Sequence, residues 1–219
     1  MTKYIKTGIT LAFFLIVFLP VFSQTEVEPW GNITGIRVHG QLMEFETNIS
    51  VVQKGWSAIN ATGKEKQRPK YSREGDKQII STNIDSLFIK EVVADAGEGT
   101  AKVNVQLNAK GAMQNEGVYF SVLLPDKFYA KGTFRINNLK SANLNQDSSV
   151  LNKYLKAPAS SIHFNSSMRQ LAITFEKPVH IIYRRGSSDD IQFLIPMQMD
   201  DAANGDSINA DFSIKASGT

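Results

Sequence analysis

Apolar and polar residues alternate over most of the chain, which is the pattern of β-strands with one buried face. The alternation is cleanest over residues 100–109, where every second residue is apolar. The apolar phase there consists of Ala101, Val103, Val105, Leu107 and Ala109. Residues 95–99 hold two glycines and are typical of a tight hairpin connection back to a strand over 84–94. We therefore expect two adjacent antiparallel strands with the apolar phase in the core.

The same pattern predicts strands elsewhere. Residues 42–51 alternate throughout and predict one strand, and 118–124 are so apolar that we expect burial on both faces before Pro125. Further strands are expected over 128–136, 162–165, 171–175, 179–183, 191–197 and 208–214. Residues 145–155 have the spacing of a short helix that ends ahead of Pro158. The pattern predicts about eleven to thirteen strands in all.

Many short strands with little helix indicate an all-β fold. We predict an antiparallel β-sandwich of two packed sheets, and the large super-sandwich of carbohydrate-active proteins is one form of that class. Glycine-, serine- or proline-rich linkers are missing from the interior of the sequence, so residues 24–219 are predicted to form a single domain.

The first 23 residues have the features of a signal peptide. Lys3 and Lys6 precede an apolar run from Ile9 to Val21, and Val21 and Ser23 are the small residues that precede a cleavage site. The run is shorter than the roughly 20 residues that a spanning helix needs. We therefore expect residues 1–23 to be removed, leaving no membrane span, and the protein to be exported to the periplasm or the extracellular space.

Composition excludes several kinds of chemistry. The chain has no cysteine, so disulfides, thiol nucleophiles and cysteine-ligated metals are excluded, and its three histidines are scattered singly. We predict no metal and no cofactor. Without Lys3 and Lys6 the 24 basic residues become 22, against 21 acidic ones, which gives no indication of nucleic-acid binding.

Paired carboxylates are weak candidates for catalysis here. Glu44 and Glu46 have the strand spacing that brings two carboxylates within the about 5 to 10 Å used by glycosidases, but solvated strand faces often carry such pairs. Residues 200–211 faintly resemble a calcium loop, yet Ala202 occupies a ligand position and Asn204-Gly205 is better explained as a hairpin turn. We predict no catalytic residue.

One loop and one tryptophan are the candidates for sugar contact. Residues 64–77 combine six basic and three acidic residues with Tyr71, and Trp56 follows a predicted strand. Aromatic rings stack on the apolar face of a sugar, and basic side chains can bind polar or acidic substituents. The carbohydrate-binding residues that we predict are Trp56, Arg68, Lys70 and Tyr71. Packing of the aromatic rings and simple solvation of the loop remain the alternative interpretations.

Four segments carry a family resemblance. They are 28–38 (EPWGNITGIRV), 40–45 (GQLMEF), 63–70 (GKEKQRPK) and 82–86 (TNIDS). This run resembles the N-terminal β-sandwich region of large exported glycoside hydrolases from polysaccharide-degrading bacteria. In that family the region precedes a catalytic (β/α) barrel, and no alternating strand–helix region that would form one exists in this sequence.

The resemblance implies a non-catalytic accessory module of an exported polysaccharide-degrading system. Such a module would pack against a catalytic domain and contact a polysaccharide or oligosaccharide. Two alternatives stay open: a small carbohydrate-active enzyme of lyase or epimerase type, and a structural or adhesive surface domain. Fold alone does not choose among them.

Overall fold

The computed structural model describes residues 24–63, 67–185, 190–197 and 201–218, and it is almost entirely β-structure. Its strands form three antiparallel sheets. The small sheet contains β1 (Thr25–Val27), β2 (Ile33–Val38) and β3 (Gln41–Glu44). The five-stranded sheet has the order β15 (Ile182–Arg185), β16 (Ile191–Pro196), β10 (Asn115–Leu124), β4 (Glu46–Gln53) and β5 (Ile59–Ala61). The predicted all-β sandwich is confirmed.

The largest sheet has nine strands and mixes early and late parts of the chain. Its order is β12 (Ala142–Asn143), β11 (Thr133–Ile136), β13 (Ala159–Asn165), β14 (Arg169–Val179), β17 (Ser207–Gly218), β9 (Thr100–Ala109), β8 (Leu87–Asp95), β7 (Lys77–Ile84) and β6 (Lys70–Glu74). The described helices are short: η1 (Lys54–Trp56), α2 (Asp126–Tyr129) and α3 (Ser148–Tyr154). Helix α3 falls where the sequence predicted one.

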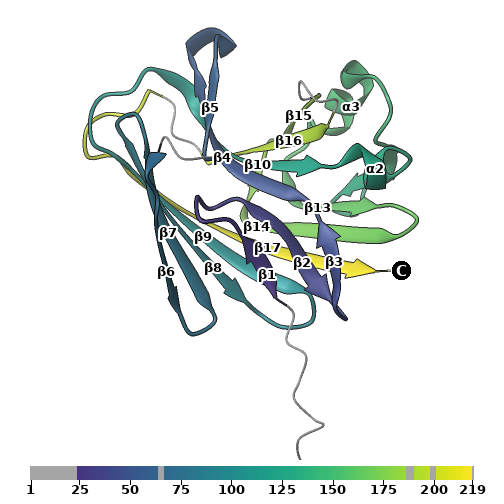
Figure 1. Cartoon of the computed structure of the whole chain (residues 1–219). Coiled ribbons are helices and arrows are strands. Elements are labelled where there is room, and N and C mark those ends of the chain that lie inside the picture. Colours follow the sequence, from purple (N-terminus) through teal and green to yellow (C-terminus); the bar gives the residue numbers. More distant parts are fainter. Residues whose placement is uncertain (1–23, 64–66, 186–189, 198–200, 219) are drawn as a thin grey trace, which may run out of the picture.

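The sheets pack face to face around one main core. In Figure 1 the five-stranded sheet lies above β13, β14 and β17, the strands β6 to β9 fan out to one side, and the small sheet crosses in front of β17. Aromatic contacts join the layers: the ring of Phe120 stacks on Phe212 at 4.5 Å, and Phe193 lies 4.8 Å from Phe164. These contacts tie β10 and β16 to β17 and β13.

Each strand of the nine-stranded sheet has an inner face toward this core and an outer face turned away from it. On β9 the predicted apolar phase is buried, with Leu107 only 1% exposed, whereas Lys102 and Gln106 point to the outer face. The hairpin over residues 95–99 is also confirmed, since Thr100 N donates to the Gly97 carbonyl. Strand β10 is buried on both faces as predicted, because a second apolar cluster around Tyr119 covers its other side.

Three strand predictions are wrong in extent, and the described residues form 17 strands where eleven to thirteen were expected. The stretch 179–183 is interrupted, since β14 ends at Val179 and β15 begins at Ile182. The stretch 42–51 breaks at Phe45, so that β3 joins the small sheet and β4 joins the five-stranded sheet. The stretch 128–136 begins as helix α2, which starts directly after Pro125, and becomes strand only at Thr133. Proline at a helix start fits its fixed φ angle. The predicted signal peptide lies outside the described residues.

Strands β14 and β17 separate partway along their length. They pair from Arg169 opposite Gly218 to Phe175 opposite Phe212. Beyond that point β17 continues along β9, whereas the end of β14 turns toward β13, where Val179 pairs with Ala159. Pro178 has no backbone N–H to donate, so it cannot support a ladder there. The result is a wedge-shaped gap in the middle of the largest sheet.

Candidate functional site

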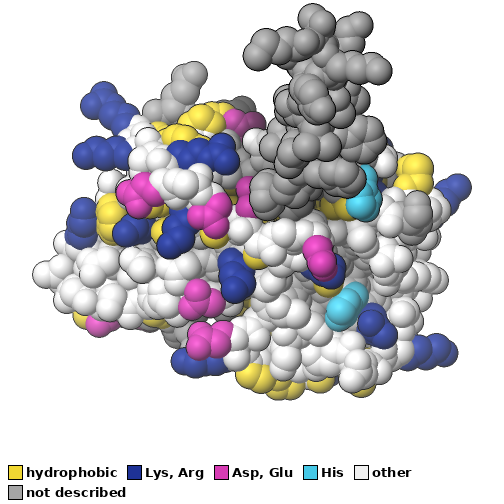
Figure 2. All heavy atoms as spheres, turned by 90° about the horizontal axis from the view of Figure 1, so that it is seen from below, with side chains coloured by type: hydrophobic (Ala, Val, Ile, Leu, Met, Phe, Trp, Pro, Cys, Tyr) yellow, Lys and Arg dark blue, Asp and Glu magenta, His cyan; other side chains and the backbone are white. Residues whose placement is uncertain are grey.

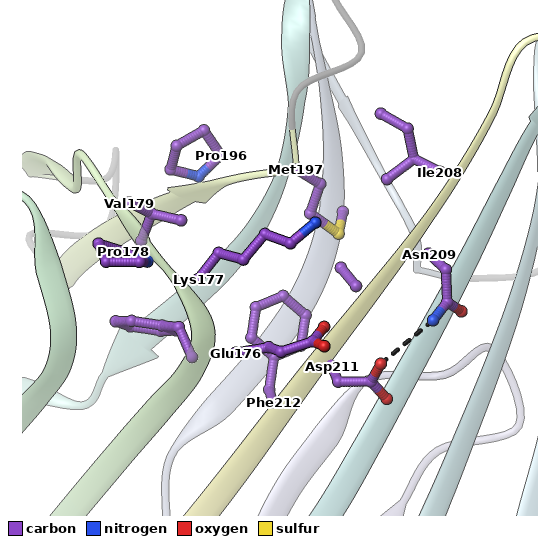
Figure 3. Close-up of a pocket in the computed structure, with 12 residues that line it drawn as sticks. Glu176, Lys177, Pro178, Val179, Pro196, Met197, Ile208, Asn209, Asp211 and Phe212 are labelled. Atoms are coloured by element: carbon purple, nitrogen blue, oxygen red, sulfur yellow. Dashed lines mark hydrogen bonds between the residues drawn. The ribbon is translucent and has the colours of Figure 1, made fainter.

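The gap between β14 and β17 forms a cleft of about 440 Å³. Its walls are residues 175–179 of β14 and 208–212 of β17, and Pro196 and Met197 at the end of β16 close it. Figure 3 shows these three segments around the opening. The cleft therefore arises from the sheet topology, at the point where two neighbouring strands stop pairing.

The cleft has an apolar floor and a polar rim. Phe175 and Phe212 belong to the core phase and are buried, at 8% and 6% exposure. On the rim, Figure 3 shows the Lys177 chain extending toward Met197 and the Glu176 carboxylate pointing toward Asp211. An apolar base with a few polar groups around it is the usual construction of a small-ligand site.

A network of side-chain hydrogen bonds organises the β17 side of the rim. Asn104 Nδ2 donates to Asn209 Oδ1 at 2.8 Å and to Asp211 Oδ1 at 2.9 Å. Asn209 Nδ2 donates to Asp211 Oδ2 at 3.1 Å. All three side chains lie on the outer face, and the strand register brings Asn104 directly opposite Asp211. The Asp211 carboxylate is thereby oriented by two amides, which also leave lone pairs and N–H groups for a ligand.

Two further hollows continue the cleft across the outer face. One is lined by Lys102, Thr174 and Ser213, among others, and shares Glu176 and Asp211 with the cleft. The other, of about 610 Å³, lies over Phe88, Gln106 and Asn108 and shares Ile208 and Asn209 with it. The candidate site is therefore an elongated, open surface rich in amide and hydroxyl groups.

Such a surface suits a polyhydroxylated ligand. Amide and carboxylate groups exchange hydrogen bonds with hydroxyls, and apolar side chains accept the C–H face of a ring. An elongated open site also fits a polymer better than a small enclosed metabolite.

Trp56, predicted to contact sugar, lies in the five-stranded part of the molecule. It belongs to η1 at the end of β4, has a φ of 59°, and is 42% exposed. Its ring lies 6.0 Å from that of Tyr119, in a tilted arrangement. One side of the indole thus packs and the other meets solvent.

The other three predicted residues lie at the edge of the nine-stranded sheet. Arg68, with a φ of 43°, precedes β6, and Lys70 and Tyr71 begin that strand. The register places Lys70 opposite Ser81 on the outer face and Tyr71 opposite Ile80 on the inner face. The Tyr71 hydroxyl donates to Gln78 Oε1 at 2.9 Å. Neighbouring strand residues point to opposite faces, so Lys70 and Tyr71 project from opposite sides of this exposed edge strand.

The carboxylates considered for catalysis are engaged elsewhere. Glu44 accepts from Lys127 and from Arg169, each at 3.0 Å, and Glu46 accepts from Asn32 Nδ2 at 3.0 Å. Partial burial alone raises the pKa of Glu44, but the hydrogen bonds from the two cations outweigh it and leave the pKa below its usual value. Arg169 is buried beneath the Phe128 ring, 3.2 Å from its centroid. This cluster is a structural tie between β3, α2 and β14.

The hairpin predicted for the segment that resembled a calcium loop is wrong, because this segment leads from β16 of the five-stranded sheet to β17 of the nine-stranded sheet, two strands that do not pair. Asp200 lies outside the described residues, and Asp201 is bound to Lys54 Nζ at 2.7 Å, a hydrogen bond that lowers its pKa. Gly205, with a φ of 94°, lies in a local turn before β17, in which Asp206 N donates to the Ala203 carbonyl. Among the described residues, no group of three or more histidine, aspartate or glutamate side chains is arranged to hold a metal ion.

Glu91 is the described carboxyl whose pKa is most strongly perturbed, and it does not line the cleft. It sits on the inner face of β8 between Ile80 and Val105, and burial raises its pKa to about 8. Its Oε1 has no hydrogen-bond partner among the described atoms. A Cβ on Gly31 would lie 2.6 Å from Glu91 Oε2, so the turn before β2 can cover this carboxyl only because residue 31 is glycine.

Charges over the end of the molecule at the hairpin turns are mixed. Figure 2 shows Lys and Arg interspersed with Asp and Glu there, and apolar side chains in separate small groups. Both signs of charge are therefore mixed over the part of this end that Figure 2 shows in colour. No helix in the described part of the chain is long and apolar enough to cross a membrane.

The sequence matches no protein-family description and no curated protein. Among solved structures, the chain is similar to a proposed mutarotase from Salmonella typhimurium, with a TM-score of 0.46 and 9% identity over 87% of this chain and 85% of that one. A heparinase III has a TM-score of 0.46 and 8% identity over 92% of this chain and 36% of that one. A polysaccharide lyase has a TM-score of 0.39 and 12% identity over 90% of this chain and 32% of that one.

This chain thus spans about a third of the length of the heparinase III and the polysaccharide lyase. The names of these neighbours are those of carbohydrate-active proteins, but at such identities and TM-scores no residue role is carried over from them. Membership of the glycoside hydrolase region that the N-terminal segments resemble stays a prediction.

Proposed function

We propose that this chain is a non-catalytic β-sandwich module of an exported polysaccharide-degrading glycoside hydrolase system, and that it contacts carbohydrate through the cleft between β14 and β17. The observation that supports the proposal is the cleft itself, an apolar floor rimmed by the side chains of Asn209 and Asp211, which hydrogen bonds from Asn104 hold in place. The export and the neighbouring catalytic domain rest on the sequence features of residues 1–23 and on the family resemblance.

The arrangement of carboxyl groups supports binding without catalysis. Glycoside hydrolysis needs one carboxyl held protonated near the scissile bond and a second one in a fixed position. Glu91, whose pKa is raised to about 8, is buried on the inner face, where a glycan has no access. Asp211 and Glu176 face the cleft, and both carboxylate oxygens of Asp211 are engaged by the amides of Asn104 and Asn209.

The test is a binding screen of the purified chain against soluble neutral and acidic polysaccharides, with product detection on the same samples. We expect retention of at least one polysaccharide without release of new reducing ends or unsaturated products. Product formation by the wild-type chain would overturn the non-catalytic role.

Substitutions test whether the cleft is the surface that binds the polysaccharide. Asn209→Ala removes a rim group on an exposed strand position and should weaken binding about tenfold, since it deletes one or two ligand hydrogen bonds and frees Asp211. Asn152→Ala on α3 is the matched control and should bind like the wild type. Equal affinities for Asn209→Ala and the wild type would show that the contact surface lies elsewhere, and Trp56→Ala would then test the tryptophan that the sequence analysis predicted to contact sugar.

A further inference from the structure

Four lysines frame a patch of the outer face beside the cleft. The register places Lys70 and Lys90 in one row, on either side of Ser81, and Lys77 and Lys102 in another, on either side of Ala94. Each row spans three adjacent strands, so the backbone positions of its two lysines lie roughly 10 Å apart. The rows are four residues apart along β7, or roughly 13 Å.

The row between them is apolar at its centre. Ile79 and Val92 face each other there and are half-buried, and the row continues through Asn104 to Asp211 at the cleft rim. The frame and the cleft are therefore parts of one continuous surface. A flat apolar strip flanked by cations fits a sugar chain that lays its C–H faces on the strip and its acidic substituents against the ammonium groups.

The charge of this face differs from that of the rest of the chain. The described strand positions of the outer face hold six basic residues and three acidic ones. The basic ones are Lys70, Lys77, Lys90, Lys102, Arg135 and Lys215, and the acidic ones are Glu74, Glu176 and Asp211. Residues 24–219 as a whole hold 22 basic and 21 acidic residues. The excess of positive charge is thus concentrated on the outer face and is balanced elsewhere.

Two of the four frame lysines lie near acidic groups of the face: Lys77 pairs in register with Glu74, and Lys102 lines one hollow with Glu176 and Asp211. Lys70 and Lys90 have Ser81 and Gln106 as their register neighbours, so no carboxylate stands directly opposite them in the described ladders. Within the described part of the chain, Lys70, Lys90 and Lys102 form no ion pair. Positive charges that form no ion pair on a solvated face remain available to an anionic ligand.

We propose that the ligand of this face is an anionic polysaccharide, bearing carboxylate or sulfate groups, whose charges lie over β6 to β9 within the frame of Lys70, Lys77, Lys90 and Lys102. The inference rests on the proposed carbohydrate contact and adds the chemical class of the sugar. A nucleic acid is a less suitable polyanion, because single strands are held largely by stacking on aromatic rings. Among the described strand positions of the outer face, Phe88 is the one aromatic residue. Lys110 Nζ lies over its ring, 4.6 Å from the centroid.

The experiment compares the wild-type chain with Lys90→Gln/Lys102→Gln by calorimetry or affinity electrophoresis. The probes are polygalacturonate, alginate, a sulfated carrageenan, neutral xylan and a single-stranded oligonucleotide, each at about 50 mM and about 300 mM NaCl. We expect tightest binding to a carboxylated or sulfated glycan, about tenfold weaker binding at the higher salt, and a further loss of about tenfold in the double variant. Carboxylated and sulfated probes distinguish the two sources of charge.

The matched control is Lys153→Gln/Lys156→Gln, which removes two exposed lysines on and after α3, outside the nine-stranded sheet. It should bind like the wild type. Binding of xylan with equal or greater affinity and no salt dependence would overturn the anionic class but leave the proposed carbohydrate contact standing. Preferential binding of the oligonucleotide, or binding of no probe by the folded protein, would overturn both.

Discussion

At the residue scale, Glu91 is the group whose position conflicts most with its chemistry. Ile89 and Val93 on either side of it in the same strand phase are core residues, and Glu91 itself is 3% exposed. Ionisation in such surroundings is costly without a partner, so the carboxyl stays protonated up to a pKa of about 8.

This burial makes stability depend on pH. In the unfolded chain Glu91 ionises near its ordinary pKa of 4.5, whereas the folded protein keeps the proton until about pH 8. Unfolding therefore releases a proton between these two values, and the stabilising contribution, complete below pH 4.5, is lost as the pH rises through about 8. The loss amounts to on the order of several kcal/mol across the window.

Glu91→Gln keeps the shape of the side chain but removes the titration. The free energy of unfolding of the variant, measured by urea denaturation from about pH 5 to about pH 9, should fall less steeply with rising pH than that of the wild type, and the variant should be the more stable protein at the alkaline end. Glu74→Gln, on the exposed strand β6, should follow the wild type. Parallel curves for wild type and Glu91→Gln would show that the carboxyl is ionised in the fold.

The sequence contains a signal for Glu91, although this residue was not among the predicted site residues. In the alternation of residues 87–93 the glutamate occupies the apolar phase, so strand phase alone marks it as an inward-facing acid. The four residues predicted to bind sugar were selected by residue type instead. Lys70 and Tyr71 point to opposite faces of β6. This could not be predicted, because the sequence pattern indicated a charged loop there and not a strand.

At the element scale, local patterns were sufficient to predict a strand wherever it has one solvent-exposed face and ends in a tight turn. Strand β9 and its hairpin to β8 were predicted for that reason. The break at Phe45 was not predicted, because the alternation of apolar and polar residues continues through Phe45 although the chain passes there from the small sheet to the five-stranded sheet. The cleft could not be predicted from local patterns either, because β14 and β17 are distant segments of the chain that meet only in the folded sheet.

Strand β9 gives the stability prediction at this scale. Leu107 pairs with Ile89 and Ile208 and is 1% exposed, so Leu107→Ala should leave a cavity and lower the free energy of unfolding by about 2 to 5 kcal/mol. Gln106→Ala, one residue away on the outer face, should change it by less than about 0.5 kcal/mol. Chemical denaturation measures both. A loss below about 1 kcal/mol for Leu107→Ala would contradict its core position.

At the scale of the whole molecule, β17 joins two groups of strands. On one side it pairs with β9, which leads to β8, β7 and β6, and on the other with β14, which leads to β13, β11 and β12. Ile214 lies where both pairings are formed, opposite Ile173 and Ala101. The nine-stranded sheet is continuous only through this strand.

Proline at position 214 should therefore disrupt both groups. Ile214→Pro removes a ladder hydrogen bond and a core side chain in a central strand, and we expect it to cost more than about 3 kcal/mol and to abolish a single cooperative thermal transition followed by circular dichroism. Ser72→Pro on edge strand β6 should keep the transition with a smaller loss. If Ile214→Pro unfolded in one step near the wild-type temperature, the two groups of strands would not depend on β17.

The place of β17 also governs when the protein can fold. It follows all the other strands of its sheet in the sequence, yet it lies among them, so the sheet cannot close until residues 207–218 have left the ribosome. Contacts between such distant segments form slowly. Until β17 has emerged, β9 and β14 lack the strand that lies between them, so each leaves one edge of its strand group without a partner.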